Sequence, residues 1–186
     1  MIIEFYKYHG TGNDFVLIDN RSLFFDKNNL ELISKICSRH TGVGADGLIL
    51  LENHSQYDFK MIYFNSDGKQ TSMCGNGGRC VISFAKKLNI IDDNVTFLAI
   101  DGLHEGIIND DIIKIKMIKV SNIDEGHNGC LLDTGSPHFV KFCTSVNNIN
   151  VFDSGRELRN NKEISEDGVN INFTEIIDNS SIKVRT

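Results

Sequence analysis

The 186-residue sequence lacks features that would place it in several large classes of protein. No apolar run approaches the roughly 20 residues that a membrane-spanning helix needs. Basic residues are not in excess: the sequence has 19 lysines and arginines and 25 acidic residues, which gives a net charge of −6. Neither nucleic acid nor an anionic membrane is therefore an expected partner. Charges interrupt the opening MIIEFYKYHG early, so no secretory signal is expected.

The five cysteines are an odd number and include no CxxC pair. Free thiols in a reducing compartment are the expectation, which favours a cytoplasmic protein. The spacing of Cys74 and Cys80 does not fit a zinc knuckle, and no paired His or Cys motif follows. No metal site is expected.

Short β-type runs outnumber helical stretches and alternate with them, in a composition with 40% hydrophobic and 24% charged residues. This mixed order predicts a globular α+β fold with largely antiparallel sheets. Helices are expected over about Leu30–Arg39 and after Gly75, where apolar residues recur on one face. A long strand is expected over Ile112–Val120. The polar segment Ser121–Gly129 that follows it is the best candidate for a linker between domains 1–120 and 121–186.

A repeat divides the chain. The segment HGTGNDFVLI resembles DTGSPHFVKF when Gly12 is aligned with Gly135, an offset of 123 residues. A fainter match aligns Gly42 with Gly168 at an offset of 126. Two matches in the same order predict two related lobes. The same offset would put the counterpart of Cys74 near position 197, beyond the last residue.

The richest segment for chemistry is FNSDGKQTSMCGNGGRC, which ends at Cys80. A β-type run ends at Phe64, a turn follows, and a helix starts after the run Cys74-Gly75-Asn76-Gly77-Gly78. Small residues at a helix start expose backbone N–H groups that suit a carboxylate or phosphate. A thiol there lies at the positive end of the helix dipole, which favours the thiolate. The alternative is a tight turn with a buried Cys74. Cys80, farther into the helix, is expected in the core.

Three motifs together carry a family resemblance: KYHGTGNDFV, HTGVGADGLI and FNSDG followed by CGNGGRC. DTGSPHFV and GVNINF continue them in the second lobe. In this order they resemble the diaminopimelate epimerases, which are cofactor-independent (PLP-independent) two-cysteine racemases and epimerases. The resemblance implies two pseudo-symmetric lobes, each a mostly antiparallel, barrel-like sheet around a central helix, with the active site in the cleft between them.

The resemblance also implies an activity and a set of site residues. LL-diaminopimelate would be converted to meso-diaminopimelate in lysine and peptidoglycan-precursor biosynthesis. Cys74 would be one of two catalytic cysteines that face opposite sides of the substrate α-carbon. The substrate-binding residues would be Asn13, Asn65, Gly75, Asn76 and Asn170, with His138 tuning the pKa of the cysteine pair.

This sequence departs from the family pattern in three places. Ser136 stands where many members have a substrate-binding Asn, and Gly47 where some have a Gln. The chain ends before the family's Glu-Arg pair and second cysteine motif, so the second lobe is expected to be incomplete and the 186-residue chain inactive for inversion. Cys74 would still exchange a proton on one face.

Two alternatives stay open. One is a proline or hydroxyproline racemase of the same fold, and the other is a non-catalytic binding module that kept the fold. The expected partner is a small amino acid, and a homodimer is a further expectation.

Overall fold

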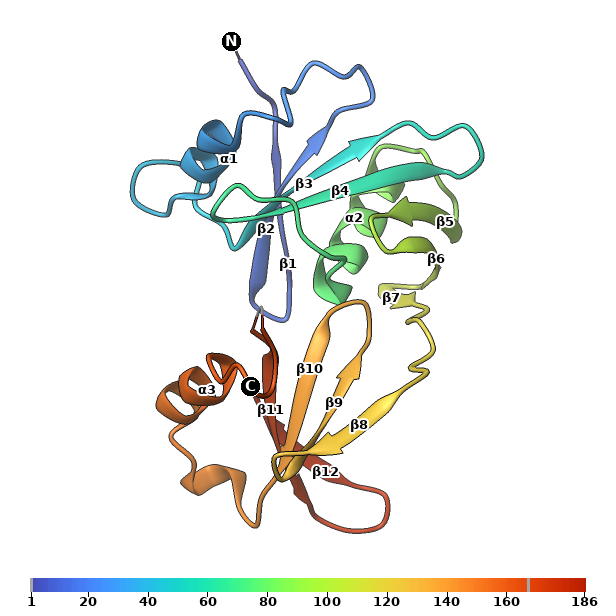
Figure 1. Ribbon diagram of the computed structural model, residues 1–186. Helices are drawn as coiled ribbons and strands as arrows, with labels where there is room; N and C mark the ends of the chain where they lie inside the picture. The colour runs from blue at the N-terminus through green and yellow to red at the C-terminus, as the bar shows by residue number, and fades with distance from the viewer. Residues whose placement is uncertain (1, 167) are drawn as a thin grey trace. The chain divides into compact units, whose positions relative to one another are not determined.

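The computed structural model describes residues 2–166 and 168–186 (Figure 1). The chain divides into two compact units, Met1–Met117 and Ile118–Thr186, and each unit is built on one mixed sheet with more antiparallel than parallel pairs. The predicted α+β class is confirmed. No helix within the described residues is long and apolar enough to cross a membrane.

The first unit carries seven strands in sequential order, β1 to β7, with one helix on each side of the sheet. Its elements are β1 Tyr6–Gly10, β2 Asn13–Asp19, α1 Leu30–Cys37, β3 Gly47–Glu52, β4 Phe59–Asn65, α2 Gly75–Lys87, β5 Asn94–Ala99, β6 Gly102–Asn109 and β7 Ile112–Ile115.

Helix α2 is the central helix of this unit. It contacts β1 and β7, the two edges of the sheet, as well as β2 and β3, so the sheet curls around it (Figure 1). Its buried side includes Val81, Phe84 and Ala85, all fully inaccessible to solvent, which is the face predicted from their spacing. The arrangement matches the barrel-like lobe with a central helix that the family resemblance implies.

The strands β2 and β3 are buried on both faces. Phe15 and Leu17 point into the core that α2 covers, whereas Val16 and Ile18 point into a second core under α1. Successive side chains of a strand alternate between faces, so a strand with two covered faces needs a continuous apolar run. The segment GLILLE of β3, buried at all six positions, meets that requirement.

The second unit has five strands in the order β12-β11-β10-β9-β8. Helix α3 packs on one face against β11, over a small core that contains Phe139, Ile171 and Phe173. The elements are β8 Ile123–Gly126, β9 Gly129–Asp133, β10 Pro137–Phe142, a 3₁₀ turn Val146–Asn148, α3 Val151–Arg159, β11 Asn170–Ile176 and β12 Ile182–Arg185.

The two units repeat one topology, as the sequence predicts. The starts of β1, β3 and β4 at positions 6, 47 and 59 recur as the starts of β9, β11 and β12 at 129, 170 and 182, a shift of 123 residues each. The parallel pair Phe15↔Gly47 recurs as His138↔Asn170 at that same shift. The fainter match at an offset of 126 is therefore misaligned by three residues, because strand register and not letter identity fixes the correspondence.

Two predicted segments are wrong. The segment Ser121–Gly129 is not a linker, since it contains β8, whose four residues are all exposed. A strand at the edge of a sheet has a solvated side and tolerates such polarity. The strand expected over Ile112–Val120 ends at Ile115. The helix expected over about Leu30–Arg39 is confirmed as α1, which ends at Cys37 because the Ser38 backbone turns to an extended conformation.

Candidate active site

One end of the first sheet gathers most of the residues singled out in the sequence. Asn13 starts β2, Gly47 starts β3 and Asn65 ends β4. The pairing Phe15↔Gly47↔Asn65 puts these positions side by side. Because side chains alternate along a strand, Asn13 and Asn65 share the face of Phe15 and Met61, which is the face that α2 covers. Both amides therefore lie on the helix side of this end.

Helix α2 begins at the same end with polar groups left open. Cys74 is its N-cap and provides no side-chain cap hydrogen bond. The Gly78 amide donates to the Cys74 carbonyl at 2.7 Å, so the amides of Gly75, Asn76 and Gly77 precede the first helical bond. Donors of this kind at the positive end of a 13-residue helix favour a bound anion.

Glycines let the helix start lie close to the sheet. A Cβ on Gly77 would come within 3.1 Å of the Ile49 Cδ1, and one on Gly78 within 2.6 Å of the Ile115 Cδ1. Both glycines are buried. Larger residues would push the first turn, and Cys74 with it, away from the strand ends.

The Cys74 thiol is half-buried and has a polar neighbour. Asn13 Nδ2 donates to Cys74 Sγ at 3.6 Å, within hydrogen-bond range for sulfur. The Cys74 sulfur thus has a donor side chain and a helix N-terminus beside it.

The turn between β1 and β2 lies against Asn76 of α2. Thr11 and Gly12, with φ of 53° and 91°, form the two-residue turn. Gly10 lies so close to the helix that an added Cβ would meet the Asn76 Cβ at 3.1 Å. Arg79 donates to Asn76 Oδ1. With its oxygen occupied, Asn76 keeps its NH₂ group for another partner.

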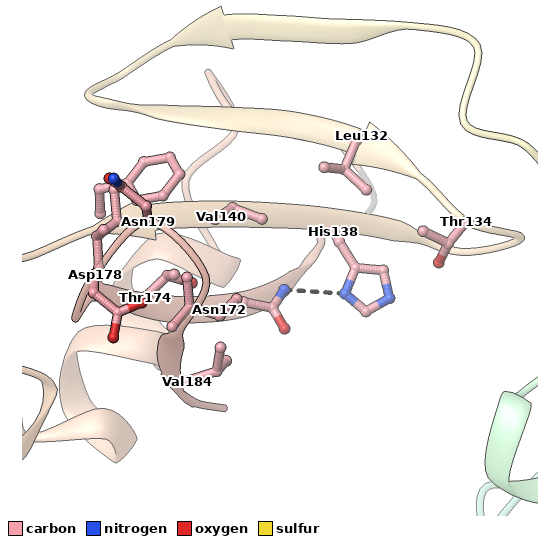
Figure 2. A pocket seen from close by; sticks show the side chains of 12 residues that line it. Leu132, Thr134, His138, Val140, Asn172, Thr174, Asp178, Asn179 and Val184 are labelled. Carbon is pink, nitrogen blue, oxygen red and sulfur yellow. Dashed lines mark hydrogen bonds between the residues drawn. The ribbon is translucent and has the colours of Figure 1, made fainter.

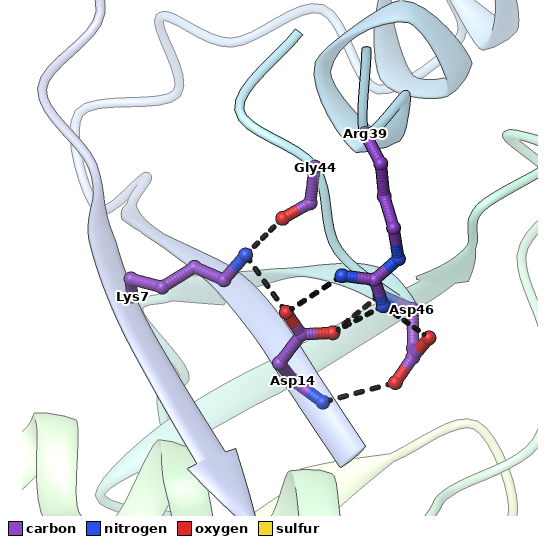
Figure 3. Close-up of polar contacts among 5 residues, drawn as sticks. All are labelled: Lys7, Asp14, Arg39, Gly44 and Asp46. Carbon is purple, nitrogen blue, oxygen red and sulfur yellow. Dashed lines mark hydrogen bonds and ion pairs between the residues drawn. The ribbon is translucent and has the colours of Figure 1, made fainter. Parts of the chain in front are cut away.

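An ion-pair network that the sequence did not reveal stabilises this sheet end (Figure 3). Asp14, next to Asn13, accepts from Arg39 Nη2 at 2.8 Å and pairs with Lys7 at 2.9 Å. Arg39 Nη2 also reaches Asp46 Oδ1 at 2.7 Å. The Asp46 amide donates to the Asp14 carboxylate at 3.0 Å, and the Asp14 amide donates to the Asp46 carboxylate at 3.1 Å. These two hydrogen bonds hold the starts of β2 and β3 together. Arg39 is the main cause that holds the pKa of Asp14 below its ordinary range.

The other two thiols of the first unit, Cys37 and Cys80, are unreactive at neutral pH. Burial raises the pKa of Cys37 and of Cys80 from 9.0 to about 11. Both are core residues, at 2% and 4% exposure, as expected for Cys80. At neutral pH they remain thiols and cannot act as bases.

The raised pKa values of Cys37 and Cys80 predict which cysteines an alkylating reagent modifies. At any pH below 9, a pKa two units higher leaves about 100-fold less thiolate, and burial restricts access further. Iodoacetamide at pH 8 should therefore modify Cys37 and Cys80 only after guanidinium unfolds the protein, as peptide mass spectrometry would show. Rapid native labelling of Cys80 would contradict this description of the core.

The second unit brings together His138, Ser136 and Asn170, three positions that the sequence singled out. Asn172 Nδ2 donates to His138 Nδ1 at 3.0 Å (Figure 2). His138 Nε2 lies 3.5 Å from Ser136 Oγ. Asn170 Nδ2 donates to Ser136 Oγ at 3.4 Å. A donor at Nδ1 makes that nitrogen the acceptor, so the neutral imidazole carries its proton on Nε2.

His138 and Asn172 line a hollow of about 600 Å³ on the sheet face opposite α3 (Figure 2). Its floor corresponds to the face that α2 covers in the first unit. Shifting Phe15, Leu17, Ile49, Leu51, Phe59 and Met61 by 123 positions gives His138, Val140, Asn172, Thr174, Ile182 and Val184, all of which line the hollow. Polar residues, His138, Asn172 and Thr174, replace three of the six apolar ones.

Tyr63 is a site neighbour that the motifs did not indicate. It lies two residues before Asn65 and so on the same face of β4, and its hydroxyl donates to Asn65 Oδ1 at 3.0 Å. The period-two alternation of DFKMIYFN was the signal available for finding it.

Comparison with known structures defines the class of fold. The crystal structure of a probable proline racemase from Agrobacterium radiobacter superposes with a TM-score of 0.70, at 15% identity, over 98% of this chain and 69% of that one. A hydroxyproline epimerase from Agrobacterium vitis superposes with the same TM-score at 13% identity, so the chain shares the fold of both structures.

Sequence comparison defines the family. A diaminopimelate epimerase family model matches residues 5–121. The diaminopimelate epimerase of Flavobacterium psychrophilum is 50% identical over 185 residues, which are 99% of this chain and 72% of that protein. The Aquifex aeolicus enzyme of the same name is 37% identical and covers 99% of this chain and 73% of its own length. The chain belongs to the diaminopimelate epimerase family.

Proposed function

We propose that this protein inverts the α-carbon of LL-diaminopimelate to give meso-diaminopimelate, without a cofactor, in lysine and peptidoglycan-precursor biosynthesis. The observation that carries the proposal is the half-buried Cys74 thiol at the start of α2, with the Asn13 amide 3.6 Å from its sulfur. Family membership supports diaminopimelate as the substrate.

In the proposed reaction the Cys74 thiolate removes the substrate's α-proton. The C–H bond breaks, an S–H bond forms, and the electron pair moves onto the carboxylate. The open amides of Gly75 and Asn76, with the helix dipole behind them, stabilise that charge. A second acid must deliver a proton to the opposite face for inversion, and the family resemblance assigns this role to a second cysteine.

The remaining site residues take their proposed roles from their positions. Asn13, Asn65 and Asn76 offer amide donors on the α2 side of the first sheet, and Asn170 offers one in the second unit. His138 would tune the cysteine pair, with Asn172 fixing its tautomer. A homodimer and a cytoplasmic location stay predictions.

Deuterium exchange tests the proposal. The 186-residue chain is incubated with LL-diaminopimelate in D₂O, and the α-proton signal is followed by NMR. Cys74 alone would return a deuteron to the face it deprotonated, so we expect loss of the α-proton signal. Chiral chromatography of the same samples measures conversion to the meso isomer, which needs the second acid.

Two controls make the result decisive. Proline and trans-4-hydroxyproline should show no exchange, since exchange of these instead of diaminopimelate would indicate a proline-type racemase. A chain that exchanges none of the three amino acids would refute the catalytic proposal and leave a binding module of this fold.

A further inference from the structure

The side chain of Tyr63 is held in one place by its neighbours. Its ring meets Phe15 edge-on, with centroids 5.7 Å apart and an interplanar angle of 78°. The other side rests on Gly47, where an added Cβ would lie 2.5 Å from Tyr63 Cε2. The absent side chain at Gly47 is what makes room for the ring. Packing thus fixes where the hydroxyl points.

The hydroxyl acts as a donor. Burial, and secondarily the nearby Cys74 thiol, raises the pKa of Tyr63 above its ordinary value, so the phenol stays protonated at neutral pH. It donates to Asn65 Oδ1 at 3.0 Å. Within the described residues, Asn65 Nδ2 donates to no protein acceptor at hydrogen-bond distance. The Asn65 amide therefore has its oxygen bound and its NH₂ group free.

This orientation decides what Asn65 can bind. An asparagine without a fixed partner rotates its amide and presents either a donor or an acceptor. With the oxygen bound by Tyr63, Asn65 presents a donor on the face that Asn13 and the start of α2 share. A carboxylate accepts from such a donor, whereas an ammonium group does not.

We propose that Tyr63 is a positioning residue for substrate binding, which holds the Asn65 amide so that its NH₂ group donates to a carboxylate of the bound diamino acid. The inference rests on the proposed function and deepens it. Tyr63 does not touch the reacting atoms, so its effect falls on binding and not on proton transfer.

The exchange reaction tests this through KM and kcat measured separately. Tyr63→Phe keeps the ring and removes one neutral hydrogen bond, so KM for diaminopimelate should rise about fivefold with kcat nearly unchanged. In an Asn65→Ala background the same substitution should add nothing. Tyr8→Phe removes the hydroxyl of another ring in the same core and should leave both constants as they are. A lower kcat at constant KM would mean that Tyr63 only stabilises the fold, and would overturn the inference.

A second measurement does not depend on activity. The side-chain NH₂ resonances of Asn65, identified by their loss in Asn65→Asp, should form one sharp pair in the wild type and should broaden or double in Tyr63→Phe. Unchanged resonances would overturn the orienting role. If the wild type shows no exchange, the proposed function and the substrate-binding part of the inference fail together, while the resonances still decide whether Tyr63 orients the amide.

Discussion

Cys74→Ala should reduce α-proton exchange from diaminopimelate by about 10³-fold, within the 10² to 10⁴ that a positioned acid–base group contributes. The alanine keeps the start of α2 and the open amides of Gly75 and Asn76, so substrate binding should survive. What is lost is the only half-buried thiol of the first unit's described residues, since Cys37 and Cys80 are in the core. NMR in D₂O measures the rate, and calorimetric titration measures binding.

The specificity of this loss is checked with matched variants. Cys80→Ala removes a thiol one and a half turns farther along the same helix, and exchange should continue at close to the wild-type rate. Cys74→Ser keeps the size and the Asn13 contact but offers a far weaker base, so it should resemble Cys74→Ala. Exchange that persists in Cys74→Ala would remove this residue from the mechanism.

Local sequence patterns predicted the parts of the site that are local. The run CGNGG predicted a helix that follows it, and α2 begins within the run, at Gly75, so the glycines form the first turn of the helix. It works as a signal because the same small residues that expose amides also allow the close approach at Gly77 and Gly78. The shift of 123 residues was visible in the sequence because a duplicated topology repeats its turns as well as its strands.

Helix α3 illustrates what the patterns could not show. Val151–Arg159 is amphipathic, but it is only nine residues long, has Gly155 at its centre and contains no fully buried residue, so its sequence gives a weak helix signal. It depends on Asn150, whose side chain accepts from the Asp153 amide at 3.2 Å, and on partial burial of Val151 and Leu158. The cap is local, but the burial of Val151 and Leu158 exists only once β10 and β11 have paired.

The network around Asp14 was invisible for a related reason. Arg39 lies 25 residues after Asp14, and no periodic pattern links them. They meet because β2 and β3 pair in parallel, with Asp14 and Asp46 one position before the pair Phe15↔Gly47. Register is a property of the assembled sheet, so the ion pairs that depend on it follow from tertiary structure.

Asp14→Asn should lower the free energy of unfolding by about 2 kcal/mol, because charge-assisted hydrogen bonds are worth about 1.5–3 kcal/mol. The substitution keeps the shape but weakens the bonds to Arg39 and Lys7, and it puts the mutual contact with Asp46 at risk. Asp14 is only 19% exposed, so water replaces those partners poorly. Urea denaturation at pH 7 measures the difference.

Asp19→Asn provides the control. Asp19 also forms a two-point pair, with Arg21 at 2.8 and 2.6 Å, but that pair joins residues two apart on one strand end and ties no second strand. Its loss should cost less than about 1 kcal/mol, as for other local surface pairs. Equal losses in the two variants would show that the Asp14 network adds no more than a surface ion pair.

The dependence on pH gives the network a separate signature. Arg39 lowers the pKa of Asp14 in the folded protein below the 3.8 of a free aspartate, so the folded state holds the ionised form more strongly than the unfolded chain does. The ionised Asp14 stabilises the fold fully above the pKa of the unfolded chain, about 3.8. This stabilisation is lost as pH falls below that pKa, because the unfolded chain then binds a proton before the folded protein does. The difference in the free energy of unfolding between wild type and Asp14→Asn should therefore be constant from pH 7 to about 5 and should narrow below about pH 4. A gap that persists unchanged at pH 3 would mean that the variant acts through packing and not through charge.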